Sequence, residues 1–349
     1  MTLTDRPARL ADVARRAGVS ITTASVVLND KAGSIPDVTQ RRVREAAEDL
    51  GYRASSLARS LRMQRSMTLG LISDDIATMP FAGALIGGAQ EAAWAANFIL
   101  VVVDTDGHPD REKHVIEELR HRQVDAFLYA TGQHTVITPP ASLIGTPTVL
   151  LDARDHAGDY TSVVPDEVQG ARTAVEHLVA AGHRRIAYLG NVEPVAATPL
   201  RREGYLQALK DAGIQADDDL IAATVPHDRG LAMQAATGLL DRADPPTALF
   251  CFSDRAAVGA YVAARQLGLT VPDDLSVVGF DNLELVADWV DPGLTTIQLP
   301  HREMGLWGVK QLVGLLTETD GDPVHHRMPC PLVERGSVAP PRERTPVRK

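Results

Sequence analysis

RLADVARRAGVSITTASVVLND, residues 9–30, decides the fold of the N-terminal part, because it holds two helical patterns separated by one glycine. The apolar residues of the first pattern recur at i, i+3, i+4 and i+7, the spacing of one helix face. They are Leu10, Val13, Ala14 and Ala17. Gly18 is expected to end this helix, since glycine readily adopts the left-handed conformation that follows a helix.

The second helix begins at Ser20, a residue whose hydroxyl suits the N-cap position. Ala24, Val27 and Leu28 lie on its inner side. The opposite side carries the residues that are available to a partner, and these are Ile21, Thr22, Ser25, Val26 and Asn29.

A third helix is predicted between Pro36 and Gly51, again from apolar residues at helical spacing. Helix, short turn, helix and supporting helix is the arrangement of a helix-turn-helix, whose second helix enters the major groove of DNA. A plain three-helix bundle has the same periodicity. Charge favours the DNA-binding interpretation, because clustered arginines suit phosphate contacts. These arginines are Arg9, Arg15, Arg16, Arg41, Arg42, Arg44 and Arg53.

The charge of the chain is divided unevenly. The 349 residues carry a formal charge of −10, which taken alone argues against a polyanionic partner. Residues 1–65, however, hold 12 Lys/Arg against 7 Asp/Glu and so carry +5, which leaves −15 for residues 66–349. A basic head on an acidic body indicates a segment that contacts nucleic acid and a body with another task.

From Thr68 onward, short apolar runs alternate with helical patterns, which predicts βαβ units and parallel sheets. Many of these runs end in carboxylate or amide side chains. Asp74, Asp75, Asp104, Asp106, Asp152, Asn191, Asp254, Asp281 and Asn282 follow them. Ligands of such sheets bind outside the carboxyl ends of the strands, so we expect a polar pocket rich in hydrogen-bond acceptors, suited to a polyhydroxylated ligand such as a sugar.

Each of these side chains has a second interpretation, because Asp and Asn also cap the helices that follow strands. Asp254, separated by Arg255 alone from AAVGAYVAARQLG, is the strongest candidate for such a cap.

Other chemistry finds little support in the sequence. DTDGHPD, starting at Asp104, lacks the third acidic ligand and the later glutamate of a calcium loop, and no histidine pair has a partner at ligand spacing. No nucleophile elbow, phosphate-binding loop or dinucleotide fingerprint follows a strand. We therefore expect no cofactor, no metal and no enzymatic activity.

The location of the protein is predicted from what the chain lacks. Cys251 and Cys330 lie far apart, the N-terminus has no apolar export segment, and the longest apolar run is residues 98–103. These features predict a cytoplasmic protein without membrane contact.

The head resembles the DNA-binding domain of the lactose-repressor (LacI/GalR) family. The resemblance rests on L-x-D-V-A-x-x-A-G-V-S, on T-x-S in the second helix, on the Leu-Asn at its end and on the later LGYR. It implies a hinge helix at SSLARSL, in which Ala58 and Leu61 enter the minor groove and Leu61 acts as an apolar wedge. A linker helix is the alternative there. The expected DNA-binding residues are Arg9, Leu10, Ser20, Ile21, Thr22, Thr23, Ser25, Val26, Asn29, Ala58 and Leu61.

Some positions depart from the family pattern. Val26 stands where arginine is usual, Ala24 where valine is common, and Ala54-Ser55 replaces Pro-Asn in the hinge. Arginine reads guanine edges, whereas valine offers only an apolar contact, for example to a thymine methyl group. The operator is therefore expected to differ from the common half-site of the family.

The body is similar to the sugar-binding core of the same family through VEHLVAAGHRRIAYLG, LRREGYLQALKDAGI and LTTIQLPHREMG, and the resemblance covers about residues 8–338. It implies two α/β subdomains joined by three crossovers, with an effector between them. Arg201 matches the arginine that clamps the effector, Asp281 the acceptor carboxylate and Ser253 an Asn/Ser position. Together with the strand-end residues, the expected effector-binding residues are Asp74, Phe81, Asp152, Asn191, Arg201, Ser253 and Asp281.

The body also departs from the family pattern. Met79 stands where asparagine is usual before Pro80-Phe81, and residues 227–230 lack the aromatic side chain that often stacks on a sugar. Pentoses, disaccharides, nucleosides and purines therefore stay open beside hexoses.

The predicted architecture is α/β with an all-α head and a core, similar to the periplasmic binding proteins, of two doubly wound subdomains. The expected segments are 1–54 for the head, 55–65 for the hinge, 66–165 with 295–325 and 166–294 with 326–340 for the subdomains, and 341–349 for a disordered tail. The predicted function is a homodimeric repressor that binds a palindromic operator on double-stranded DNA under control of a small effector, such as a sugar. A sugar-binding sensor or transport component without DNA binding is the alternative, and a carbohydrate-processing enzyme is a third possibility.

Overall fold

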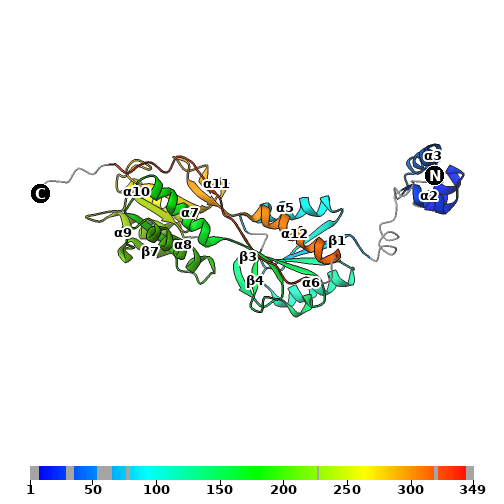
Figure 1. Ribbon diagram of the computed structural model, residues 1–349, viewed down its shortest axis with the longest axis horizontal. Coiled ribbons are helices and arrows are strands. Elements are labelled where there is room, and N and C mark those ends of the chain that lie inside the picture. The colour runs from blue at the N-terminus through cyan, green and yellow to red at the C-terminus, as the bar shows by residue number, and fades with distance from the viewer. Residues whose placement is uncertain are drawn as a thin grey trace. The chain divides into compact units, whose positions relative to one another are not determined.

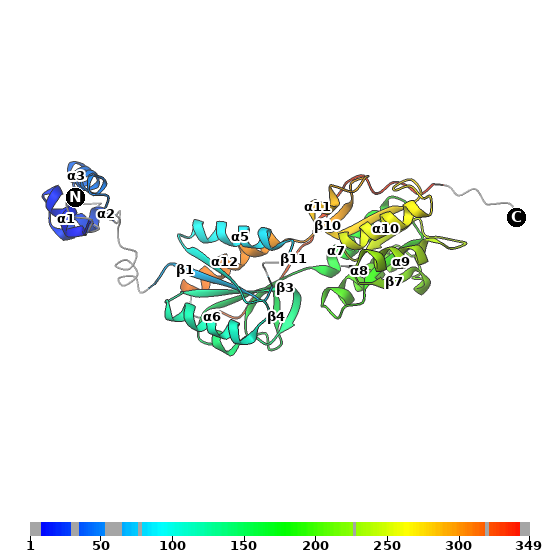
Figure 2. The same cartoon turned by 180° about the vertical axis from the view of Figure 1, so that it is seen from behind.

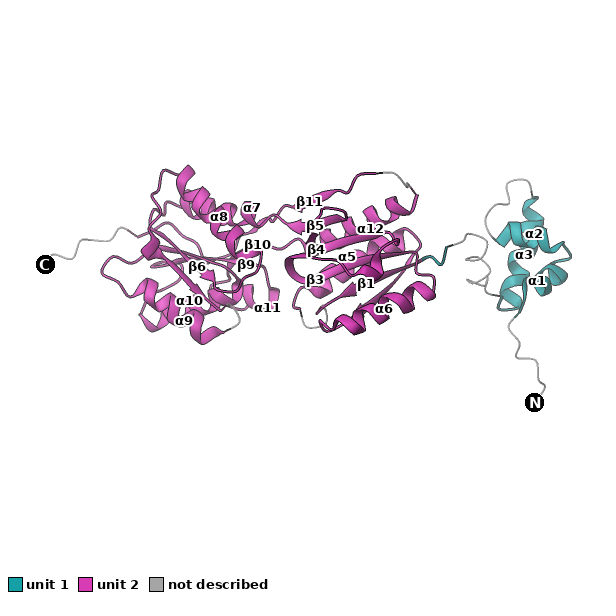
Figure 3. Cartoon of the chain, turned by 90° about the horizontal axis from the view of Figure 1, so that it is seen from below, with its two compact units in different colours: residues 1–67 teal, residues 68–349 magenta. Residues whose placement is uncertain are grey.

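The computed structural model describes residues 8–28, 35–52, 65–75, 79–225, 228–317 and 321–342. The chain divides into two compact units, Met1–Met67 and Thr68–Lys349 (Figure 3). Each unit has a buried core of its own.

Unit 1 contains, among its described residues, α1 Leu10–Ala17, α2 Ile21–Leu28 and α3 Asp37–Asp49 (Figure 1). Gly18 follows α1 with a φ of 62°, the left-handed conformation that ends the helix. The Ser20 hydroxyl accepts a hydrogen bond from the Thr23 N–H at 3.0 Å and so caps α2. The three helices predicted from the sequence are confirmed.

The core of unit 1 consists of small and branched apolar side chains. Its buried members are Val13, Ala14, Ala17, Ala24, Val27, Val43, Ala46 and Ala47. The Arg42 guanidinium donates to the Ala17 carbonyl oxygen at 2.8 Å, which ties α3 to the end of α1. This packing fixes the orientation of α2, because its inner residues Ala24 and Val27 are fully buried.

Unit 2 contains two six-stranded sheets among its described residues, each in a lobe of its own (Figure 1). The first sheet is entirely parallel in the order β11-β5-β4-β3-β1-β2, and the second, in the order β12-β10-β9-β8-β6-β7, has β12 as its antiparallel edge. The strands of the first lobe are β1 Thr68–Ser73, β2 Ile99–Asp104, β3 Ala126–Ile137, β4 Thr148–Asp155, β5 Thr161–Pro165 and β11 His325–Met328. Those of the second lobe are β6 Ile186–Asn191, β7 Ile221–Thr224, β8 Ala248–Cys251, β9 Ser276–Asp281, β10 Thr295–Gln298 and β12 Leu332–Val333.

Helices cover the sheets in both lobes (Figure 2). The first lobe has α5 Ala82–Ala95, α6 Pro109–His121, α12 His301–Thr317 and the short 3₁₀ helix η1 Ala141–Leu143. The second has α7 Glu167–Ala180, α8 Ala197–Asp211, α9 Arg229–Leu240, α10 Asp254–Gln266, α11 Glu284–Ala287 and η2 Asp218–Leu220. The α/β core predicted from alternating apolar runs and helical patterns is confirmed.

The chain passes between the two sheets three times along the described strands: after β5, after β10 and after β11. Strand pairing places two of these passages differently from the expected boundaries at residues 294/295 and 325/326. Residues 295–298 pair with β9 in the second lobe, and residues 325–328 pair with β5 in the first. A short apolar run shows that a strand is present, but its partner is chosen by tertiary contacts that the run itself does not encode.

Glycines allow helices to pack closely in both lobes. A Cβ at Gly305 of α12 would collide with the Leu85 carbonyl oxygen of α5, and one at Gly88 would collide with the Arg302 carbonyl oxygen. Of the two adjacent glycines of α5, only Gly88 makes such a contact, since a Cβ at Gly87 would meet no atom within 4 Å.

This contact predicts the effect of a matched pair of substitutions in α12. Gly305→Ala should lower the free energy of unfolding by about 1–3 kcal/mol, because the backbones of α5 and α12 must separate. Gly314→Ala, in the same helix but with no neighbour within 4 Å, should be neutral or stabilising by up to about 1 kcal/mol. Chemical denaturation of both variants checks this, and equal stability of the two would contradict it.

Candidate functional site: an acidic cavity between the lobes of unit 2

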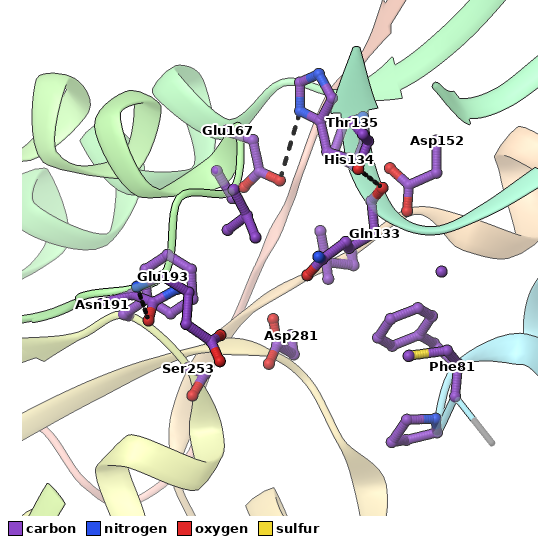
Figure 4. A pocket seen from close by; sticks show the side chains of 18 of the residues that line it. Phe81, Gln133, His134, Thr135, Asp152, Glu167, Asn191, Glu193, Ser253 and Asp281 are labelled. Carbon is purple, nitrogen blue, oxygen red and sulfur yellow. Dashed lines mark hydrogen bonds and ion pairs between the residues drawn. The ribbon is translucent and has the colours of Figure 1, made fainter. Parts of the chain in front are cut away.

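A cavity of about 720 Å³ lies where the carboxyl ends of strands from both sheets face each other. Its lining comes from β3 and β4 of the first lobe, from β6 and β9 of the second, and from the segments that connect the lobes (Figure 4). All seven residues expected at the effector site border this one cavity: Asp74, Phe81, Asp152, Asn191, Arg201, Ser253 and Asp281.

Arg201 of α8 is the most extensively contacted cation of the cavity. Its Nε donates to Glu167 Oε2 at 2.7 Å, and its Nη1 donates to the Phe252 carbonyl oxygen at 2.5 Å and to Asp281 Oδ1 at 3.3 Å. The guanidinium carbon also lies 3.6 Å from the centre of the Phe280 ring and 4.5 Å from that of Phe252. Arg201, only 4% exposed, therefore binds two carboxylates of the protein itself.

Asp281, which contacts this arginine, forms an acidic pair with the buried Asp254. Burial raises the pKa of Asp281 to about 6, although Arg201 acts in the opposite direction. Burial and then the charge of Asp281 raise the pKa of Asp254 to about 8. Asp254 accepts hydrogen bonds from the Thr296 hydroxyl at 2.5 Å and from the Leu283 N–H at 2.7 Å, so it fastens the chain that follows β9.

The prediction that Asp254 caps α10 is wrong. Ser253 is the N-cap, and its hydroxyl accepts from the Ala256 N–H at 3.2 Å. Asp254 is the first residue of the helix, fully buried and directed toward β10 and the segment after β9. The sequence Ser-Asp offers two capping residues in a row, and only tertiary packing decides between them.

Asp152, which borders the cavity, keeps one buried acceptor without a partner. It is 3% exposed and has a φ of 58°, which places a non-glycine residue in the left-handed region. Asp152 Oδ2 lies 3.4 Å from His301 Nε2, while the buried Oδ1 has no hydrogen-bond partner. The His301 ring in turn stacks on Phe81 with 4.1 Å between ring centres.

His134 connects the first lobe electrostatically to the second. Its Nδ1 lies 4.0 Å from Glu167 Oε1, a distance marked in Figure 4, and has no hydrogen-bond partner although it is buried. Burial lowers the pKa of His134, while Asp152 and Glu167 act against this shift. The neutral imidazole therefore offers the cavity a nitrogen that can donate or accept, according to its tautomer.

The remaining expected residues are held by the protein near their strand ends. Asp74 Oδ1 accepts from the Gly132 N–H at 2.9 Å, and burial raises the pKa of this carboxyl. Asn191 donates to the Thr198 hydroxyl at 3.2 Å and accepts from the Glu193 N–H at 3.0 Å. Asp104 and Asp106 do not border the cavity, because β2 is the edge strand of its sheet.

Several polar residues of the cavity were not singled out from the sequence: Gln133, His134, Thr135, Glu167, Glu193 and His301. Glu167 follows the apolar strand β5, so its place in the sequence is the same as that of the carboxylates expected at the other strand ends. His301 lies in LPHREMG. The β3 residues had no such signal, because the strand continues through an irregular register between Ala130 and Thr135.

The expected DNA-binding residues of unit 1 lie on and beside α2. Ile21 and Thr22 are exposed, Ser25 and Val26 are half-buried, and the Ser20 and Thr23 hydroxyls lie 2.8 Å apart.

Two further DNA-binding candidates lie at α1. The exposed Arg9 precedes the helix and donates its N–H to Asp12, and Leu10 packs against the core. Asn29, Ala58 and Leu61, with the predicted hinge helix, lie outside the described residues.

Two properties concern the described residues as a whole. They contain no group of three or more His, Cys, Asp or Glu side chains that could hold a metal ion. Their helices also include none with the length and apolar character needed to cross a bilayer.

Comparison with known proteins explains this combination of head and cavity. Residues 9–55 match the model of bacterial regulatory proteins of the lacI family, and residues 175–338 match the periplasmic binding protein-like domain. The ribose operon repressor of Escherichia coli (strain K12) is 33% identical over 335 residues, which cover 95% of this chain and 100% of that protein. The chain belongs to the lacI family.

Two further relatives agree. The HTH-type transcriptional repressor PurR of Vibrio vulnificus (strain CMCP6) is 31% identical over 95% of this chain and 98% of its own. The crystal structure of the lac repressor dimer bound to operator and the anti-inducer ONPF has a TM-score of 0.75 at 26% identity, over 96% of this chain and 100% of its own. The protein is therefore a LacI-type DNA-binding transcriptional regulator with a small-molecule effector domain, and a transport component without DNA binding is not favoured.

The pKa values of the acidic pair predict how stability depends on pH. A carboxyl with a pKa near 8 keeps its proton in the folded state after the unfolded chain has lost it, so the free energy of unfolding falls as pH rises toward 8. His134, whose pKa is lowered, acts in the opposite direction only near and below its unfolded value of about 6.5.

Between pH 7 and 8.5 the thermal midpoint of the wild type should therefore fall. In Asp254→Asn, which cannot titrate at this position, the fall should be smaller. Thermal unfolding of both proteins across this range checks the prediction, and parallel curves would contradict it.

Proposed function

We propose that the protein is a homodimeric repressor that binds a palindromic operator, and that an uncharged, polyhydroxylated molecule such as a sugar is its effector. The observation that carries the effector proposal is the cavity of about 720 Å³ with its excess of hydrogen-bond acceptors. We assign no enzymatic activity, since the relatives named above are transcriptional repressors.

Exposed apolar side chains support a dimer. Trp94 is 66% exposed, Ile99 is 64% exposed and Val102 is 38% exposed at the end of α5 and on the edge strand β2. Leu285 and Trp289, at and just after α11, are both 80% exposed. An open strand edge beside a large aromatic residue suits pairing with a second copy, and a twofold dimer presents two heads to two half-sites. This is the basis for expecting a palindromic operator.

The charge of the cavity argues against an anionic effector. Six carboxylates border it, from Asp74, Asp75, Asp152, Glu167, Glu193 and Asp281, against the two arginines Arg201 and Arg255. Arg201 is already engaged by Glu167 and Asp281, so it does not offer an unpaired positive charge to a phosphate or carboxylate group. Hydroxyl groups suit this lining, because they donate to carboxylates without adding negative charge.

Two atoms define where such hydroxyls bind. Asp152 Oδ1 is a buried acceptor without a partner, and His134 Nδ1 is a buried nitrogen without one. Leaving such groups unpaired is costly, so a ligand that donates to Asp152 gains more than it would at the surface. Phe81 and the His301 ring stacked on it offer a flat apolar wall nearby.

The mechanism that we propose is linkage between the cavity and the DNA. The cavity is lined from both lobes, so a bound effector favours one angle between them over others. The hinge helices predicted at residues 55–65 precede β1 of the first lobe, and their order on DNA depends on the two copies lying together. An effector that separates the hinges releases DNA, and one that brings them together promotes binding.

The operator proposal is tested by selecting duplexes from a random pool with the purified full chain at moderate salt. We expect a palindromic site whose affinity changes when sugars, nucleosides and purines are titrated, and does not change with sugar phosphates. Selection of no palindromic site would contradict the regulator mechanism proposed here. A response to sugar 6-phosphates stronger than to the parent sugars would contradict the uncharged effector.

The role of Asp152 is tested by Asp152→Asn, which keeps the shape of the side chain and removes its charge. Affinity for the effector found in that panel should fall by about 10- to 100-fold, because a hydrogen bond to a buried charged acceptor is weakened. Asp219→Asn, at an exposed residue of η2, is the control and should bind as the wild type does. Calorimetric titration measures both, and equal affinity of the two variants would remove Asp152 from the effector site.

A further inference from the structure

Between Ile21 and Leu28, the outward face of α2 carries no charged or amide side chain, and Asn29, which follows, lies outside the described residues. Ala24 and Val27 are fully buried in the core of unit 1, which directs positions 21, 22, 25 and 26 away from it. These are isoleucine, threonine, serine and valine. Ile21 is 55% exposed, so its large apolar side chain is available to a partner.

This composition limits what the helix can read in a major groove. Guanine is read by Arg or Lys, adenine by Asn or Gln, and cytosine by Asp or Glu, and Ile21–Leu28 contains none of these. Serine and threonine hydroxyls contact several bases and discriminate weakly. The C5-methyl group of thymine is the feature of the groove that an isoleucine or valine side chain recognises.

Among the described arginines of unit 1, Arg15, Arg16 and Arg42 do not supply the guanine readout that Ile21–Leu28 lacks. Arg15 and Arg16 lie on α1, where they pair with Asp12 and Asp49. Arg42 lies on α3 and donates to the Ala17 carbonyl oxygen. All three come from helices other than α2, so their charge serves the fold and the phosphate backbone.

We infer that α2 recognises its half-site through thymine C5-methyl groups, with Ile21 and Val26 as the residues that contact them. The inference rests on the proposed entry of α2 into the major groove of the operator. Val26 is half-buried, whereas Ile21 is 55% exposed and reaches further into solvent.

The test uses the operator obtained by selection, with each thymine of both half-sites replaced in turn by uracil. This change removes the methyl group and keeps every hydrogen-bonding group of the base pair. At one or more symmetric positions the affinity of the full chain should fall about fourfold per methyl group, or about fifteenfold for the symmetric pair. Unchanged affinity at every thymine overturns the inference.

Variants of α2 test whether the loss of operator affinity on uracil replacement depends on this helix. Ile21→Ala should bind the thymine operator more weakly and should lose most of its sensitivity to uracil at one position, as a double-mutant cycle measures. Val38→Ala is the matched control, because Val38 lies on α3 of the same unit and is 59% exposed. Val38→Ala should lose as much operator affinity on uracil replacement as the wild type does.

Two outcomes distinguish failure of thymine-methyl recognition by α2 from failure of the proposed operator binding. Equal uracil sensitivity in Ile21→Ala, Val26→Ala and the wild type overturns the inference, since the methyl group then acts through the shape of the DNA. Failure to select any palindromic site contradicts the proposed operator instead.

Discussion

The interaction of Arg201 with Glu167 and Asp281 holds the second lobe's side of the cavity together. One guanidinium joins the start of α7, the end of β9 and the Phe252 carbonyl group before α10, and two aromatic rings cover its faces. Removing one member of such a buried arrangement leaves an unpaired charge behind. The arrangement therefore fixes the positions of Glu167 and Asp281 at the cavity.

Polar contacts continue from this arginine into the first lobe. Glu167 faces His134 of β3, and Asp281 is influenced electrostatically by His301 of α12, whose ring contacts Asp152. His134 thus lies within electrostatic range of Asp152 in the first lobe and of Glu167 in the second. His301 is related in the same way to Asp152 and to Asp281. These contacts are long or indirect. We therefore expect a ligand that binds Asp152 and His134 to weaken or strengthen them, and so to change the angle between the lobes.

Local sequence signals predicted much of this molecule. Gly18 and Ser20 fix the turn between α1 and α2 through backbone conformation and capping, which neighbouring residues determine. Strand ends predicted cavity residues well, because topology brings the carboxyl ends of parallel strands to one edge of the sheet. Asp74, Asp152 and Asp281 reach the cavity for this reason.

What the sequence did not predict depends on long-range packing. Ser253, and not Asp254, caps α10, because Asp254 bonds Thr296, which lies 42 residues later. β10 joined the second sheet through pairing with β9. His134 reaches the cavity only because β3 continues past an irregularity of register, which the apolar run before it did not signal.

In the mechanism that we propose, one free energy couples the cavity to the DNA. Two comparisons measure it: effector affinity for the free and for the operator-bound protein, and operator affinity with and without saturating effector. We expect both comparisons to give the same factor, different from one and on the order of 5- to 150-fold. A factor of one in both comparisons would contradict it.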